Sequence, residues 1–120
     1  MEERVRFIEH SKKSILLIDF SGCSAQEMMS VLADVQETIT SHPRGSVLTL
    51  ADFTGAHVDK DVAKRIKEVL VFDRPYVQRS AWVGTEGLPQ VFYEGFKQFS
   101  QREFPTFATR EEAMEWLAKE

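Results

Sequence analysis

The residues best suited to recognition or chemistry lie in one short segment, between an apolar run and a stretch with helical spacing. The candidates in this segment are Asp52, Thr54, His57, Asp59 and Lys60. The segment follows the carboxyl end of an expected central parallel strand, where α/β proteins commonly place their sites. We therefore interpret it as a candidate surface for contact with a partner protein or a ligand.

Each of these residues also has a local interpretation, which we favour when the residue is taken singly. Asp59 is expected to cap the following helix, and Asp52 and Thr54 are expected to close a turn. Phosphate binding at the helix start is disfavoured, because Asp59 and Asp61 would repel an anion there.

The sequence offers no pattern typical of a metal site or an activated nucleophile. His10, His42 and His57 fall in three different turns and lack the spacing of metal ligands. Cys23 precedes a helix, where the helix dipole favours a thiolate, but no His or Asn lies near it in sequence. We interpret Cys23 as a small packing residue and expect no metal.

The glycine-rich segment 84–87 resembles a phosphate-binding loop only superficially. It lacks the lysine and the glycine spacing of such loops, and Glu86 carries the wrong charge. Catalytic groups must converge in space, and no paired acid and base or nucleophile triad is visible. We therefore expect no catalytic residues, no cofactor and no enzymatic activity.

Aromatic residues are concentrated towards the end of the chain: Phe92, Tyr93, Phe96, Phe99, Phe104 and Phe107. Aromatic residues at helical spacing most often fill a core, which is our first interpretation. The cluster is dense enough to leave two alternatives open, a cavity for an apolar small molecule and a homodimer interface.

The order of apolar patterns predicts the fold. Strands are expected at residues 5–8, 14–20, 46–51 and 76–83, with a further extended segment at 104–107. Helices are expected after the capping boxes at 24–27 and 109–112, after Asp59, and after the 84–87 segment. Helices between strands imply parallel crossovers. The prediction is one α/β domain over 1–120, with a mixed sheet of four to five strands, parallel central strands, an antiparallel first strand and about four helices.

Composition excludes several classes of protein. The 120-residue chain carries a formal net charge of −4 and scattered basic residues, which argues against nucleic-acid binding. Its longest apolar run, residues 15–18, is far shorter than the roughly 20 residues of a membrane span. The charged start at residues 1–4 leads into no apolar signal region, and a lone cysteine requires no oxidising compartment. We expect a cytoplasmic protein.

Several segments resemble the small bacterial SpoIIAA-like proteins, which are relatives of the STAS domain and are linked in shape to the lipid-binding CRAL-TRIO domains. The segments are SVLTLADFTGA at 46–56, RPYV at 74–77, SAWVG at 80–84 and EEAMEWL at 111–117. The resemblance runs from about Phe7 to Leu117 and implies a STAS-like fold. For function, it implies a regulatory module that binds a protein partner.

One departure from the family pattern concerns its phosphorylation switch. In anti-sigma-factor antagonists an Asp-Ser pair starts the helix after this loop, and the Ser is phosphorylated. Here Lys60 follows Asp59, and no Ser occurs between Ser46 and Ser80. Thr54 is the loop's only hydroxyl and the only candidate acceptor left there.

Three functions are ranked on these grounds. A non-enzymatic regulatory or interaction module with an unidentified protein partner comes first, and an apolar-ligand or lipid-binding domain is the alternative. An enzyme is a distant third.

Overall fold

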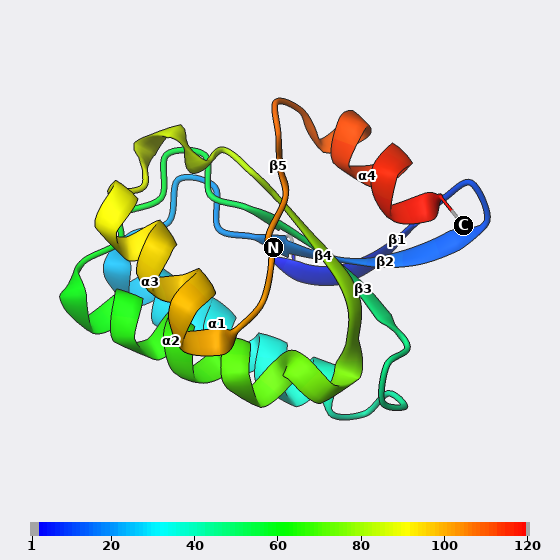
Figure 1. Ribbon diagram of the computed structural model, residues 1–120, viewed down its shortest axis with the longest axis horizontal. Helices are drawn as coiled ribbons and strands as arrows, with labels where there is room; N and C mark the ends of the chain where they lie inside the picture. The colour runs from blue at the N-terminus through cyan, green and yellow to red at the C-terminus, as the bar shows by residue number, and fades with distance from the viewer. Residues whose placement is uncertain (1–2, 120) are drawn as a thin grey trace.

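A five-stranded sheet with helices on both faces forms the computed structural model, which describes residues 3–119 (Figure 1). The strands are β1 (Val5–His10), β2 (Lys13–Asp19), β3 (Val47–Asp52), β4 (Val77–Val83) and β5 (Thr106–Phe107). The helices are α1 (Ala25–Ile39), α2 (Lys60–Asp73), α3 (Gln90–Ser100) and α4 (Arg110–Ala118). Two short 3-10 helices, η1 (Arg74–Tyr76) and η2 (Thr85–Gly87), flank β4.

The strands lie in sequence order across the sheet, β1-β2-β3-β4-β5. A tight turn at Ser11 and Lys12, both at positive φ, makes β1 antiparallel to β2. The remaining pairs are parallel, each joined through a helix. The predicted mixed α/β sheet is therefore confirmed, with its first strand antiparallel and its central strands parallel.

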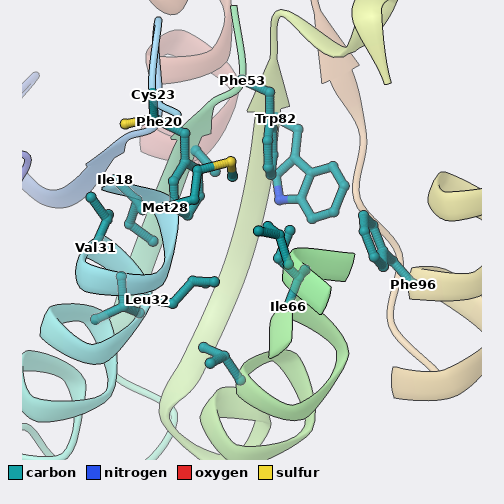
Figure 2. Packing of buried hydrophobic residues seen from close by; sticks show 14 of the residues in the cluster. Ile18, Phe20, Cys23, Met28, Val31, Leu32, Phe53, Ile66, Trp82 and Phe96 are labelled. Atoms are coloured by element: carbon teal, nitrogen blue, oxygen red, sulfur yellow. The ribbon is translucent and has the colours of Figure 1, made fainter. Parts of the chain in front are cut away.

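Three helices, α1, α2 and α3, cover one face of the sheet, and α4 alone covers the other (Figure 1). The three-helix face encloses the aromatic core, in which Trp82 stacks on Phe104 at 4.3 Å between ring centres. Phe53 lies 4.8 Å from Trp82 on the other side, and Phe20 lies 5.0 Å from Phe53 (Figure 2). This core therefore depends on large rings from strand ends and from the segment after α3.

The α4 face has a smaller, aliphatic core. Its buried residues are Ile15, Leu17, Leu48, Leu50, Ala81, Val83, Ala113 and Leu117. Only the last two belong to α4. Half-buried Met114 and Trp116 of the same helix also pack against this core, so α4 contributes two buried and two half-buried apolar side chains.

Two helix starts follow the sequence prediction. Ser24 and Glu27 form the complete capping box of α1, and Asp59 accepts from the Val62 backbone N–H at 2.8 Å to cap α2. The box predicted at Thr109 is only half formed. The Glu112 carboxylate accepts a hydrogen bond from the Thr109 hydroxyl at 3.3 Å rather than from the Thr109 backbone N–H. The cap itself is present, since Thr109 Oγ1 accepts from the Glu112 backbone N–H at 3.1 Å.

The aromatic cluster divides between core and surface. Phe96 and Phe104 are buried, and half-buried Tyr93 donates its hydroxyl to the Phe104 carbonyl at 2.7 Å. Phe99 is 58% exposed, on the outer side of α3. Phe107 instead packs near Trp116 of α4, with 5.7 Å between ring centres. The core interpretation therefore holds for part of the cluster only.

Candidate functional site at the carboxyl end of the sheet

Loops from three strand ends meet at the carboxyl edge of the parallel strands, and backbone hydrogen bonds hold them together. Gly22 N–H donates to the Thr54 carbonyl at 2.8 Å, and His57 N–H donates to the Cys23 carbonyl at 3.0 Å. The loop after β4 packs so closely against the loop after β3 that it requires glycine. A Cβ on Gly84 would lie 2.3 Å from Thr54 Oγ1. The loop conformations are therefore mutually fixed.

Two neighbouring strands end in the same local structure. Asp19-Phe20-Ser21-Gly22 follows β2 and Asp52-Phe53-Thr54-Gly55 follows β3. In the first, Asp19 Oδ1 accepts from the Ser21 N–H at 3.0 Å and from the Ser21 hydroxyl at 2.5 Å. In the second, Asp52 Oδ1 accepts from the Thr54 N–H at 2.9 Å and from its hydroxyl at 2.7 Å.

The second half of each motif also repeats. Phe20 and Phe53 stack in the core, and Gly22 and Gly55 take positive φ values of 65° and 69° that suit glycine. Each motif thus places an aspartate on the α4 face of the sheet and a phenylalanine on the three-helix face. The two parallel strands end as a matched pair.

Arg110, the first residue of α4, joins the two aspartates. Its Nε lies 2.7 Å from Asp52 Oδ2 and its Nη2 lies 3.2 Å from Asp19 Oδ1. Arg4 adds a second positive charge, donating to the Ser21 carbonyl at 2.9 Å and lying 3.9 Å from Asp19 Oδ1. Two arginines and two aspartates therefore form a charge-balanced cluster.

The cluster favours the ionised forms of Asp19 and Arg110. Burial opposes ionisation of Asp19, but the hydrogen bonds from Ser21 and the charges of Arg110 and Arg4 outweigh it, so its pKa lies below 3.8. Burial likewise opposes the charge on Arg110, but hydrogen bonding and attraction to Asp52 and Asp19 raise its pKa. Groups held ionised in this way are suited to fastening structure rather than to exchanging protons near neutral pH.

Of the five predicted site residues, Asp52 is buried and the other four are exposed. Asp52 is buried and is saturated by Thr54 and Arg110, while Asp59 caps α2, so their predicted local roles are confirmed. Thr54 is exposed, although its hydroxyl donates to Asp52. His57 and Lys60 are exposed beside it. We call the exposed residues of these loops the carboxyl-edge surface: Gly22, Ser24, Thr54, Gly55, His57, Asp59 and Lys60.

Sequence reasoning missed four members of this region: Arg4, Asp19, Ser21 and Arg110. The repeated Asp-Phe-Ser/Thr-Gly motif was the signal that could have identified Asp19 and Ser21. Arg110 lies 58 positions from Asp52, and only the return of α4 over the sheet brings them together.

Cys23 lies at the end of the β2–α1 turn, directly before the N-cap residue Ser24, and is fully buried. Burial raises the pKa of its thiol, with a smaller contribution from Glu27 and Asp19, against the opposing charge of Arg4. This supports its interpretation as a packing residue. Within residues 3–119, no three His, Cys, Asp or Glu side chains gather as a metal site would require.

The helices of the same range are all too short or too polar to cross a membrane. No protein-family model matches the chain, and searches of curated proteins and of solved structures find no match. The resemblance to the SpoIIAA-like proteins therefore stays a prediction based on the sequence segments that carry it.

Proposed function

We propose that this protein is a non-enzymatic regulatory or protein-interaction module of the STAS or SpoIIAA-like type, which docks a protein partner on its carboxyl-edge surface. The proposal rests on one observation: hydrogen bonds and close packing hold the loops at this edge in fixed positions relative to one another. A preorganised surface loses less conformational entropy on binding than a mobile one.

The chemistry of the edge supports binding rather than catalysis. The carboxylates of Asp19 and Asp52 accept hydrogen bonds from their own turns and pair with Arg110, so neither is free to act on a substrate. The exposed residues of this surface carry hydroxyl groups, an imidazole, a carboxylate, an ammonium group and glycine backbone. These suit hydrogen bonding and charge complementarity with a polar protein surface.

The first test of this proposal is affinity capture from the source cells, with protein identification by mass spectrometry. The wild-type chain and a His57→Ala variant are compared. We expect a reproducible partner that the wild type retains and the variant loses in part. Equal capture of every protein by both chains would contradict docking through this surface.

Phosphorylation of Thr54 is a regulatory hypothesis attached to the same surface. Thr54 is an exposed residue whose hydroxyl donates to Asp52 at 2.7 Å, and a phosphate there would face the Asp52 carboxylate. Modification would therefore break the turn through repulsion between like charges. Phosphopeptide analysis of protein from the native cell tests it, and an unmodified Thr54 under several growth conditions would argue against it.

A second copy of the chain is another partner that we propose to test. On α3, Val91 is 73% exposed and Phe99 is 58% exposed, so both side chains are available for an apolar contact. Light scattering on a sizing column distinguishes a dimer from a monomer. The apolar-ligand alternative has less support, because the cavity within the three-helix face has a volume of about 40 Å³, against roughly 300–1,000 Å³ for ligand pockets.

A further inference from the structure

The small cavity on the three-helix face has one polar wall. It lies between the sheet and helices α1 and α2, and most of its lining is apolar, including Ile66, Val69 and Trp82. At one end it is bordered by polar residues from separate elements: Thr49, Asp73, Ser80 and Arg102. A polar wall in an otherwise apolar cavity needs an explanation, because burying unpaired polar groups is unfavourable.

Asp73, the last residue of α2, is the least satisfied of these groups. It is only 5% exposed, and its Oδ1 has no hydrogen-bond partner within residues 3–119. Leaving a buried acceptor unpaired costs about 1–3 kcal/mol, and more for a charged group. Buried polar atoms in folded proteins are almost always satisfied by protein or by ordered water.

The neighbouring polar groups form a continuous chain. Arg102 donates from Nη2 to Ser80 Oγ at 2.7 Å and from Nη1 to the Leu70 carbonyl at 2.9 Å. Ser80 Oγ lies 2.7 Å from Thr49 Oγ1, across the pairing of β3 with β4. This chain brings hydroxyl and guanidinium groups to the wall that Asp73 shares.

The cavity is the right size for water. Its volume of about 40 Å³ exceeds the roughly 10–15 Å³ that one water requires, and is too small for most organic ligands. A buried water also needs about two to four polar partners, which this wall can provide. We propose that the cavity is a binding site for one to a few ordered water molecules, which join Asp73 Oδ1 to the Arg102–Ser80–Thr49 chain.

Two of the polar residues of this cavity also border the outer surface of the molecule. Ser80 and Arg102 also line a depression of about 280 Å³ on the outer surface, together with Arg74, Gln78 and Glu103. Arg102 therefore lines both the cavity and the surface depression.

The same wall makes this part of the molecule sensitive to pH. Burial raises the pKa of Asp73 to about 7, while the charges of Arg102 and Arg65 act in the opposite direction. Burial lowers the pKa of Arg102 to about 10, with Asp73 opposing the shift and Arg74 adding to it. Because the raised pKa belongs to the folded state, the stability linked to the Asp73 proton is present below pH 3.8 and is lost as pH rises through 7.

The water site is tested by nuclear Overhauser transfer from water to the methyl groups of Ile66 and Val69. We expect cross-peaks of the sign given by long-lived internal water, retained in Asp73→Asn, whose amide can still bond to water. They should disappear in Asp73→Leu, which removes the polar partner and fills the space. Absence of the cross-peaks in the wild-type protein would show a dry cavity and overturn the proposal.

If Asp73→Leu does not fold, the wild-type cross-peaks still decide whether the cavity holds water, and two further measurements test the burial of Asp73 on which the site depends. A carboxyl-carbon NMR titration should give Asp73 a midpoint near pH 7, and Asp73→Asn should lack that titration. Wild-type stability should fall between pH 5 and pH 8 more than that of Asp73→Asn. A midpoint near pH 4, with equal pH dependence in both chains, would contradict a buried Asp73 beside this cavity.

Discussion

The two faces of the sheet are held by different kinds of interaction. On the three-helix face, rings and aliphatic side chains from three helices enclose a core with one buried carboxyl group, that of Asp73. On the other face, one short helix covers a smaller aliphatic patch. The first face depends mainly on apolar burial, and the second depends heavily on polar contacts at the two ends of α4.

The polar contacts of α4 are clear at both ends. Arg110 at its start contacts Asp19 and Asp52. Near its end, Glu115 lies 2.7 Å from His10 Nε2, and Arg79 donates to the Lys119 carbonyl at 2.6 Å. Apolar burial is little affected by protonation, whereas ion pairs depend on it. The comparison therefore predicts that the faces differ in their response to mutation and to acid.

The largest effect is expected in the aromatic core. Trp82→Ala removes the ring on which Phe53 and Phe104 pack, and we expect it to lower the free energy of unfolding by about 3–5 kcal/mol. Leu117→Ala, on the α4 face, should cost about 2 kcal/mol, the low end for such changes, because it lies in the smaller of the two cores. Urea denaturation measures both, and a larger loss for Leu117→Ala would contradict the comparison.

The next effect concerns the start of α4. Arg110→Met leaves Asp19 and Asp52 without their shared counter-charge, and we expect a loss of about 1–3 kcal/mol. This is less than for a fully buried pair, because the Arg110 side chain is 32% exposed. Amide hydrogen exchange should show lost protection in α4 before any loss in α2.

The matched control for that experiment is Arg6→Met, which removes an exposed arginine from β1. It should change stability by about 0.5 kcal/mol or less. If both variants weakened α4 equally, the Arg110 cluster would have no special role in fastening the helix.

A smaller effect is expected in acid. The pKa of Asp19 lies below 3.8 in the folded protein, so its contribution to stability is present above that pH and is lost as pH falls through the folded pKa. Hydrogen exchange, corrected for the intrinsic rate, should show α4 opening first as pH falls below about 4. Asp73 on the other face binds its proton over that range, so α2 should keep its protection. Parallel loss in both helices would contradict the difference between the faces.

The smallest effect is expected at the other end of α4. Glu115→Gln should cost about 0–1 kcal/mol, because the Glu115 side chain is 66% exposed and surface ion pairs contribute little. A loss in urea denaturation as large as that of Arg110→Met would show that the end of α4, rather than its start, fastens the helix.

Most of the fold could be predicted because its signals are local. Alternating strand and helix patterns predicted the parallel sheet. Ser24, Glu27 and Asp59 predicted the starts of α1 and α2 from short local motifs. The outer side of α3 was less clear, because Phe92, Tyr93, Phe96 and Phe99 together surround much of the helix. Sequence spacing alone does not say which stripe of such a helix faces the sheet.

The candidate site was predicted only in part, because its key contacts join distant positions. Asp52 and Thr54 were recognised through turn chemistry, but their partner Arg110 comes from α4. Asp73 carries no sequence signal either, since an aspartate at a helix end ordinarily faces water. Its burial results from the segment after α3, which brings Arg102 over the end of α2.

The most direct test of partner docking on the carboxyl-edge surface compares two matched charge reversals. Lys60→Glu changes that surface, and Arg44→Glu makes the same change of charge in the exposed loop before β3, at the opposite edge. Equilibrium binding to the partner identified by capture should weaken by about tenfold or more for Lys60→Glu, equal to about 1.4 kcal/mol, and by less than about twofold for Arg44→Glu. Equal weakening by both, or weakening by Arg44→Glu alone, would contradict the account.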